Sequence, residues 1–279
     1  MRQANGDASA RRAKRKEVVL KALQCLGLLK LFLRARERTL AARSSGNENR
    51  PATDGLPVPQ AVLRMRVAGT GDFDWFLESG ARAAAGIRSA LSRYGAAPEQ
   101  INGILDFGCG CGRVVRRWAG VSGVHGCDLS AEAVAWCRAN LGFAQFATNG
   151  PEPPLRYAGE SFDFVYALSV FTHLAGCQQH AWMRELHRVL RPDGLLLITT
   201  HGIGFVDHLS TSERERYDAG NLVVRWKGVA GSNMCSAFHP EPYLRGPFSS
   251  GFELLEFKPE GAAGNPPQDQ ILLRKSTPR

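Results

Sequence analysis

Apolar positions follow two different spacings from residue 61 onward. Short apolar runs that end in glycine, aspartate or polar residues predict buried strands at 101–107, 124–128, 162–168, 195–200, 252–257 and 270–274. Apolar residues at helical spacing predict helices at 73–94, 113–119, 131–140 and 178–190. The sequence RPDG at 191–194 is typical of a turn. Strands that alternate with helices predict an α/β fold in which helices cover both faces of a parallel sheet.

The chain before residue 61 has a different pattern. Residues 1–16 are polar and basic, and we expect them to be disordered. Residues 18–33 are mostly apolar and predict a helix, which Lys21 and Lys30 interrupt. Ser, Gly, Asn and Pro are frequent from 44 to 60, as in linkers. The expected organisation is a partly disordered basic arm with one apolar helix, a linker and one domain, at 1–50, 51–60 and 61–279.

The net positive charge of the chain lies in the arm. The net charge of the chain is +9, and residues 1–50 hold 13 Lys and Arg against 4 Asp and Glu, which is also +9. Residues 51–279 hold 22 of each and are neutral, so the domain lacks the basic excess of a nucleic-acid enzyme. The apolar helix with basic flanks indicates peripheral contact with an anionic membrane through residues 17–41. Packing of this helix on the domain or on a partner, or an over-long annotated start, are the alternatives.

Cysteine and histidine usage restricts the chemistry. The seven cysteines are scattered without CxxC spacing, which favours reduced thiols and a cytoplasmic protein, peripheral to the inner membrane face if the arm binds lipid. No apolar run reaches the ~18 residues that span a bilayer. The histidines show neither HxH nor HExxH spacing, and we expect no metal site.

The strongest motif follows the first strand of the domain, in the sequence DFGCGCGR (106–113). Alternating glycines allow a sharp turn and the close approach of a ligand. The second strand ends in Asp128, whose carboxylate can accept both hydroxyls of a ribose. A nicotinamide site would show G-x-G-x-x-G, but Arg113 stands at the last glycine position, which disfavours an oxidoreductase. An acid before the glycines suits the ammonium group of S-adenosylmethionine better.

Four segments in order carry a family resemblance: DFGCGCGR (106–113), GCDLS (126–130), ESFDFVYALSVFTHL (160–174) and ELHRVLRPDGLLLITTHG (185–202). Together they resemble the class I S-adenosylmethionine-dependent methyltransferases. The resemblance implies a three-layer, Rossmann-like fold with a seven-stranded, mostly parallel sheet and S-adenosyl-L-methionine as the cofactor. Residues 61–80 and the sequence SVFTHL also resemble a bacterial subgroup that modifies sugars, glycans and small metabolites.

The resemblance also implies roles for individual residues. Asp106 would hold the methionine ammonium group, and Gly108, Gly110 and Gly112 would let the cofactor lie against the loop. Asp128 would bind the ribose hydroxyls and Leu129 would pack on the adenine. The remaining implied positions are Asn149 and Gly150 near the adenine amine, Ser169 near the methionine portion, and Arg66 and Phe73 as a cover from the N-terminal side.

The acceptor is less well defined. The fourth strand is followed neither by a D/N-P-P-Y/F/W element nor by a proline and a cysteine, which disfavours methylation of nucleic-acid bases. This leaves an oxygen, or less favourably a nitrogen, of a small molecule or glycan. A hydroxyl acceptor needs a base, for which His173 and His201 follow strand ends and are favoured over His239.

Residues 203–250 are expected to form a lid over the acceptor. Trp226, Phe238 and Tyr243 could build a stacking wall there or a minor hydrophobic cluster. The alternative to an enzyme is a non-catalytic S-adenosylmethionine-binding module that docks through its basic arm. The sequence leaves the oligomeric state open.

Overall fold

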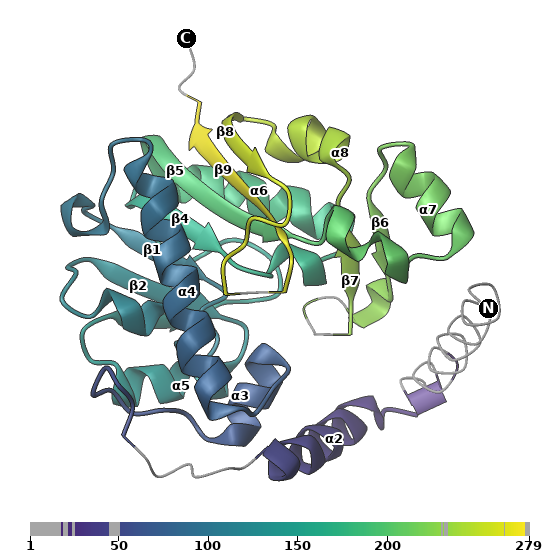
Figure 1. Ribbon diagram of the computed structural model, residues 1–279, viewed down its shortest axis with the longest axis horizontal. Helices are drawn as coiled ribbons and strands as arrows, with labels where there is room; N and C mark the ends of the chain where they lie inside the picture. Colours follow the sequence, from purple (N-terminus) through teal and green to yellow (C-terminus); the bar gives the residue numbers. More distant parts are fainter. Residues whose placement is uncertain are drawn as a thin grey trace.

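A seven-stranded sheet forms the centre of the computed structural model, which describes residues 18, 22–23, 26–44, 51–229, 231, 234–264 and 266–276 (Figure 1). The strand order is β3-β2-β1-β4-β5-β9-β8. The strands are β1 (Ile104–Phe107), β2 (Val124–Asp128), β3 (Gln145–Thr148), β4 (Phe162–Ala167), β5 (Leu190–Thr200), β8 (Phe252–Lys258) and β9 (Asp269–Lys275). Strands β1 to β5 pair in parallel, whereas β9 is antiparallel to both of its neighbours. The expected three-layer, mostly parallel fold is therefore confirmed.

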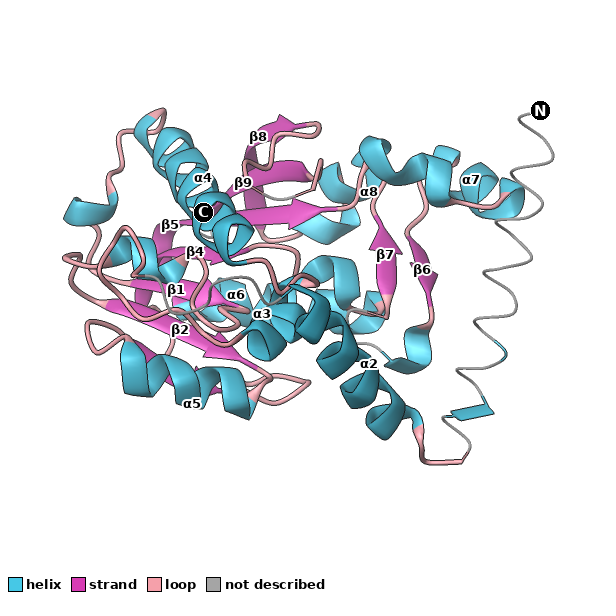
Figure 2. Ribbon diagram, turned by 60° about the horizontal axis from the view of Figure 1, so that its bottom comes forward, coloured by secondary structure: helices cyan, strands magenta, loops and turns pink. Residues whose placement is uncertain are grey.

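Helices cover both faces of this sheet (Figures 1 and 2). The described helices are α2 (Leu29–Ser44), α3 (Ala61–Ala68), α4 (Phe73–Ser92), α5 (Ala131–Asn140), α6 (Gly176–Val189), α7 (Thr211–Asp218) and α8 (Glu241–Arg245). One core lies between the sheet and α4 with α5, and the other lies between the sheet and α6 with α8. A separate hairpin of β6 (Val223–Arg225) and β7 (Ser236–Phe238) stands beside the main sheet.

Local capping explains where two of these helices begin. The Asp72 carboxylate accepts a hydrogen bond from the Trp75 amide, 2.7 Å away, at the start of α4. The Ser130 hydroxyl accepts one from the Ala133 amide at 3.3 Å, so the expected helix 131–140 begins as the sequence predicts.

Several sequence predictions of local structure are wrong. The helix expected at 113–119 is only a 3-10 turn, Val115–Trp118, because Gly120 at φ +92° turns the chain away. The turn expected at 191–194 lies within β5, where the pairing with β4 shifts register. The short strand β3 was missed because only two of its four side chains are buried.

The N-terminal helix also departs from the prediction for 18–33. Leu26 and Gly27 form a turn, with Gly27 at φ +69°, and α2 begins only at Leu29. Parts of the predicted helix, and the disorder predicted for 1–16, lie outside the described residues. None of the helices in the described part of the chain is long and apolar enough to cross a bilayer.

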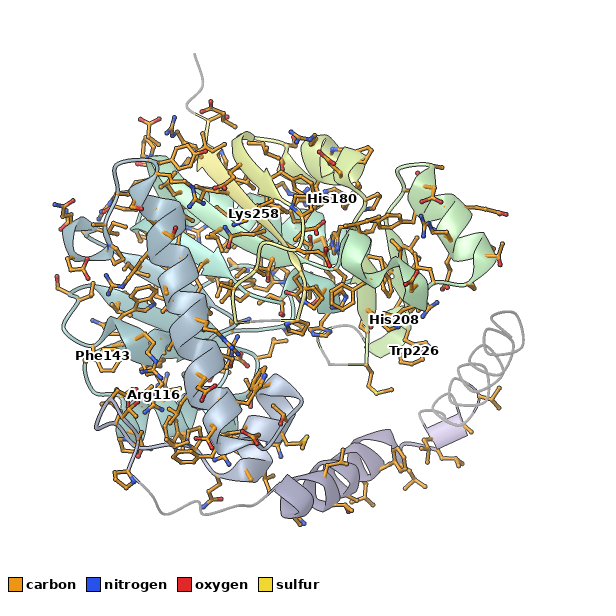
Figure 3. The ribbon with its side chains drawn as sticks, viewed as in Figure 1. Arg116, Phe143, His180, His208, Trp226 and Lys258 are labelled. Carbon is orange, nitrogen blue, oxygen red and sulfur yellow. The ribbon has the colours of Figure 1, made fainter. Side chains whose placement is uncertain are left out.

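The segment 51–60, expected to be a linker, lies along the domain. The Asp54 carboxylate accepts two hydrogen bonds from the Arg116 guanidinium, at 2.6 and 2.7 Å. Arg116 is fully buried inside the domain (Figure 3) and also donates to the Leu56 carbonyl at 2.9 Å. Because of this buried ion pair, residues 51–60 bring α3 to the end of the sheet where the strands β1, β2 and β4 stop.

Candidate active site

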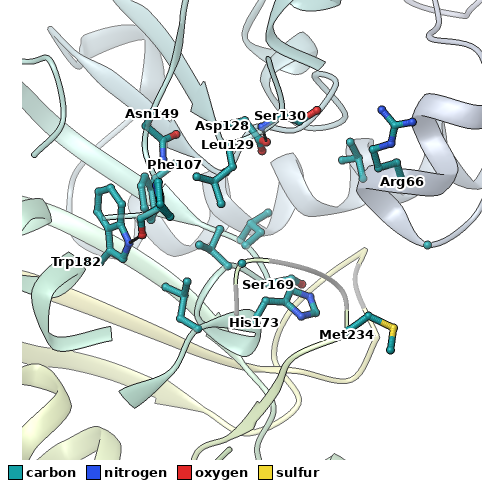
Figure 4. Close-up of a pocket in the computed structure, with 18 of the residues that line it drawn as sticks. Arg66, Phe107, Asp128, Leu129, Ser130, Asn149, Ser169, His173, Trp182 and Met234 are labelled. Carbon is teal, nitrogen blue, oxygen red and sulfur yellow. Dashed lines mark hydrogen bonds between the residues drawn. The ribbon is translucent and has the colours of Figure 1, made fainter. Parts of the chain in front are cut away.

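A cavity of about 620 Å³ opens beyond the carboxyl ends of three adjacent strands (Figure 4). It is bounded by Gly108 after β1, by Asp128 at the end of β2 and by Ser169 after β4. Ligands of open α/β sheets bind at this edge. The full lining is Leu40, Met65, Arg66, Val67, Gly69, Phe107, Gly108, Asp128, Leu129, Ser130, Asn149, Pro151, Leu168, Ser169, Val170, His173, Leu174, Trp182, Gly231 and Met234.

The loop after β1 curls tightly against β2. The amides of Gly108 and Cys109 both donate to the Cys127 carbonyl, at 2.8 and 3.0 Å. Gly108 has φ +85°, and a Cβ placed on it would lie 2.3 Å from Cγ2 of Val170, across the cavity wall. Glycine at this position therefore lets the Val170 side chain pack directly against the loop backbone.

Asp128 holds this loop through its side chain. One carboxylate oxygen accepts a hydrogen bond from the Gly110 amide at 2.8 Å, and the other accepts from the Ser130 amide at 2.7 Å. Burial raises the pKa of Asp128, and the two backbone N–H donors oppose that rise. Each oxygen keeps lone-pair capacity, so the carboxylate can also accept hydroxyl groups from a ligand in the cavity.

Leu129 and Asn149 lie next to Asp128 in the lining. Leu129 is 40% exposed, although large apolar side chains of this domain are mostly buried. The Asn149 side-chain nitrogen donates to the Gly150 carbonyl at 2.8 Å. Its Oδ1 atom is buried without a hydrogen-bond partner among the described residues, so this oxygen is available to an amine donor.

Ser169 shapes the floor of the cavity at the end of β4. Its φ of +61° is unusual for a residue with a side chain. Its amide donates to the Thr199 hydroxyl at 2.8 Å, and its own hydroxyl donates to Oε1 of Gln268 at 2.9 Å. These bonds to β5 and to the residue before β9 fix the turn that places Ser169 at the cavity.

Asp106 lies beneath the glycine loop and outside the described lining of the cavity. Burial raises its pKa to about 7, while the Tyr166 hydroxyl and the positive charge of Arg113 act in the opposite direction. The Trp118 indole in turn donates to the Tyr166 oxygen at 2.9 Å. The structure thus places Asp106 in a buried polar network that supports the loop.

Comparisons with known proteins agree with this geometry. Residues 105–198 match a family model described as a methyltransferase domain. This central part of the chain is thus similar to a methyltransferase domain. The match covers both acidic strand ends, the glycine loop and the segment after β4.

Several solved structures have the same fold as this chain. A S-adenosylmethionine-dependent methyltransferase from Methanosarcina mazei is 23% identical, with a TM-score of 0.51 over 67% of this chain and 98% of that chain. One from Mesorhizobium loti is 18% identical, with a TM-score of 0.51 over 68% and 98%. The Burkholderia thailandensis 1,6-didemethyltoxoflavin N1-methyltransferase, solved with S-adenosylhomocysteine, is 20% identical, with a TM-score of 0.50 over 73% and 81%.

The cavity fits S-adenosylmethionine, the cofactor expected from the sequence. The Asp128 carboxylate suits the ribose hydroxyls, and the exposed Leu129 side chain suits the flat adenine. The buried, unpartnered oxygen of Asn149 suits the adenine amine. Five of the residues expected around the cofactor line the cavity: Gly108, Asp128, Leu129, Asn149 and Ser169. Four others are absent from its described lining: Asp106, Gly110, Gly112 and Gly150.

Among the three candidate bases, His173 is the one that lines the cavity (Figure 4). Its Nδ1 atom lies 2.8 Å from the Cys235 carbonyl. A carbonyl oxygen only accepts, so Nδ1 carries the proton and Nε2 keeps its lone pair. Burial lowers the pKa of His173, which keeps the ring neutral at neutral pH.

His201 and His239 lie behind His173. The ring centres of His173 and His201 are 6.4 Å apart, and Phe205 packs on His201 at 4.1 Å. His239 is fully buried, and its Nε2 atom lies 3.1 Å from Oε1 of Gln179. Burial lowers the pKa of His201 to about 4 and that of His239 to about 3. Of the two histidines that follow strand ends, His173 is therefore the one in the described lining of the cavity.

The N-terminal helices close one side of the site. Met65, Arg66 and Val67 from α3 line the cavity, and Leu40 from α2 joins them. Arg66 forms an ion pair with Glu132 at the start of α5. Phe73, the other residue expected to cover the cofactor, is buried in a core cluster instead.

The expected lid contributes a different set of side chains from the one proposed. Gly231 and Met234 line the cavity, and the Gly231 amide donates to the His173 carbonyl at 2.8 Å. Phe238 and Tyr243 are buried in core clusters, and Trp226 lies outside the described lining (Figure 3). The stacking-wall hypothesis is therefore replaced by the hydrophobic-cluster alternative for Phe238 and Tyr243.

The sequence analysis missed much of the apolar wall. Leu168 and Val170 flank Ser169, so the strand-end argument could have found them. Trp182 on α6 also lines the cavity, and it packs on Phe107 with ring centres 4.8 Å apart. Among the described residues, no group of three or more His, Cys, Asp or Glu side chains is arranged to hold a metal ion.

Proposed function

We propose that the protein transfers a methyl group from S-adenosylmethionine to an oxygen, or less favourably a nitrogen, of a small molecule or glycan. The observation that supports this most strongly is a single cavity that holds both the Asp128 carboxylate and the neutral His173 ring. A cofactor half and an acceptor half therefore share one space. The bound sulfonium supplies the electrophilic methyl group.

Residues around Asp128 would hold the cofactor half. The Asp128 carboxylate accepts the ribose hydroxyls, Leu129 packs against the adenine and Asn149 Oδ1 accepts from the adenine amine. Ser169 and the backbone at Gly108 would lie along the methionine portion. Two of these groups are fixed before binding, because Asp128 and Ser169 are held by hydrogen bonds to the protein. Such positioning supplies much of the rate of an in-line displacement.

His173 would act on the acceptor half. An acceptor hydroxyl donates to Nε2, and the proton moves to this nitrogen as the oxygen takes the methyl group. The Cys235 carbonyl accepts from Nδ1–H and keeps the ring in the required tautomer. The apolar side chains of Met65, Leu174 and Met234 in the same lining would exclude water and contact apolar parts of the acceptor.

The experiment uses methyl-labelled S-adenosylmethionine with pools of small metabolites and of glycans, and mass spectrometry identifies the labelled product. We expect labelling by the wild type and a loss of turnover in His173→Ala, with cofactor binding by calorimetry retained. His180→Gln is the matched control, because His180 contacts Tyr243 on α8, 3.3 Å away, and is absent from the described cavity lining. Cofactor binding without any turnover would contradict the proposal and favour a binding module.

A further inference from the structure

Large apolar side chains are exposed in one short part of the chain. Seven such side chains are exposed among the described residues, and five of them lie between positions 18 and 32. They are Val18 (64% exposed), Leu26 (69%), Leu28 (47%), Leu31 (67%) and Phe32 (41%). Single exposed apolar residues are ordinary, but a cluster of this kind marks a contact surface.

Part of this surface points away from the domain. Ala41, at the other end of α2, is buried against Ala61 and Met65 of α3, and Leu40 faces the cavity. Leu31 and Leu40 are nine residues apart, which puts them about half a turn apart around the helix. Figures 1 and 2 show α2 at the periphery of the molecule, beyond α3. Leu31 therefore belongs to the face of α2 opposite the one that packs on the domain.

Charge identifies the occupant of this surface. The first 50 residues carry a net charge of +9, and the rest of the chain is neutral. Arg38 is exposed and lies seven residues after Leu31, so both share one helix face. Apolar side chains flanked by cations, on a helix too short and too polar to cross a bilayer, match an anionic lipid surface.

We propose that the exposed side chains of Val18, Leu26, Leu28, Leu31 and Phe32, with the net positive charge of the arm, dock the protein on an anionic membrane. The turn at Leu26 and Gly27 presents Leu26 and Leu28 beside the exposed side of α2. Leu31 and Phe32 continue this apolar surface onto the helix.

Docking also sets the position of the cavity. Leu40 is on the same helix as Leu31 and lines the cavity, so docking would hold a helix that lines the cavity at the membrane. An acceptor that partitions into the lipid would then be concentrated near the protein. This second statement rests on the proposed function, and it makes the acceptor a lipid-borne hydroxyl compound.

Co-sedimentation of the full chain with lipid vesicles tests the docking and needs no turnover. Phosphatidylcholine vesicles are compared with vesicles that also contain phosphatidylserine. The test variant is Leu31→Asp with Phe32→Asp. Ile203→Asp is the matched control, because Ile203 is 49% exposed and lies outside the proposed surface. Circular dichroism and thermal unfolding establish that all three proteins are folded.

We expect the wild type and Ile203→Asp to bind the phosphatidylserine vesicles, and the double variant to bind them at least about tenfold less tightly. Added salt should weaken the binding. Equal binding of the double variant, or equal binding to neutral vesicles, would overturn the proposal. Concentration-dependent self-association that the double variant abolishes, without vesicle binding, would show a second copy of the chain as the occupant instead.

The acceptor statement has its own readout. Labelled methyl transfer is followed into the lipid extract and into the aqueous fraction of the same reaction. Label in the lipid extract supports a lipid-borne acceptor. Label only in the aqueous fraction overturns the lipid-borne acceptor but leaves the proposed methyltransferase activity intact. If neither fraction is labelled and vesicle binding is retained, the proposed function alone has failed.

Discussion

Replacement of Asp128 by asparagine tests how the cofactor would be held. The carboxylate oxygens accept from the Gly110 and Ser130 amides, at 2.8 and 2.7 Å. Asparagine offers one acceptor oxygen and turns an NH2 group toward the other amide, so one buried N–H loses its partner. We expect a loss of about 1–3 kcal/mol in the free energy of unfolding.

The same substitution should weaken cofactor binding. Hydrogen bonds to a charged group are worth about 1.5–3 kcal/mol, which corresponds to roughly a 10- to 150-fold rise in the Kd for S-adenosylmethionine. Isothermal titration calorimetry measures the Kd, and urea unfolding measures the stability. Both are performed at a temperature where circular dichroism shows a folded variant.

Asp163→Asn is the matched control for this experiment. Asp163 lies at the start of β4, far from the carboxyl end, and accepts from the Asn102 amide at 2.7 Å and from Arg191 at 2.8 Å. Its replacement should lower stability and leave the Kd unchanged. A folded Asp128→Asn variant whose Kd stays within about twofold of the wild type would refute the ribose contact.

Three further predictions follow from the site and its support. The lowered pKa of His173 places the acidic limb of the kcat/KM profile below pH ~6.5. His173→Gln should remove that limb and lower kcat by about 10²- to 10⁴-fold. A limb that persists in the variant contradicts the role of His173 as the base. Gly110→Ala should destabilise the fold by more than about 1 kcal/mol, because φ is +53° and the new Cβ would lie 2.1 Å from Cγ1 of Val67. A second change, Val67→Ala, should restore part of that loss in urea unfolding, and no recovery would show that the contact is not responsible. Asp106 has a folded-state pKa of about 7, above the ~3.9 of an unfolded chain, so the folded state binds more protons and the free energy of unfolding falls as pH rises from about 4 to about 7. Urea unfolding of Asp106→Asn should show a weaker decline over that range. Identical slopes for the wild type and the variant would count against the buried, proton-binding carboxyl group.

The sequence predicted the part of the site that strand ends determine. Glycines and acids at the ends of parallel strands meet at one edge, which is why Gly108 and Asp128 were found. Ser169, which the family resemblance implied, lines the same cavity. The same argument failed for His201, because the 3-10 turn Ile203–His208 folds over it and Phe205 packs on its ring. A strand-end rule locates a residue but does not say which later segment will cover it.

Long-range packing accounts for the other gaps. No spacing rule connects Leu40 or Met65 to Asp128, yet apolar packing of α3 on α4 and α5, and of α2 on α3, brings these helices to the cavity. The strands of the sheet were predicted well where apolar residues are frequent, as in β4 and at 195–198 in β5, and poorly for β3, in which two of the four side chains are exposed. The local sequence pattern therefore predicts most strands of the sheet, whereas the residues that line the cavity from α2 and α3 depend on tertiary contacts.

The central claim is that the adenosyl cofactor binds in the cavity beyond β1, β2 and β4. A crystal structure of the protein with S-adenosylhomocysteine measures this directly. The account predicts ribose hydroxyls on the Asp128 carboxylate, adenine beside Leu129 with its amine at Asn149 Oδ1, and the sulfur on the side of His173. Adenosyl density at any other place, or a cavity that stays empty at saturating ligand, would contradict it.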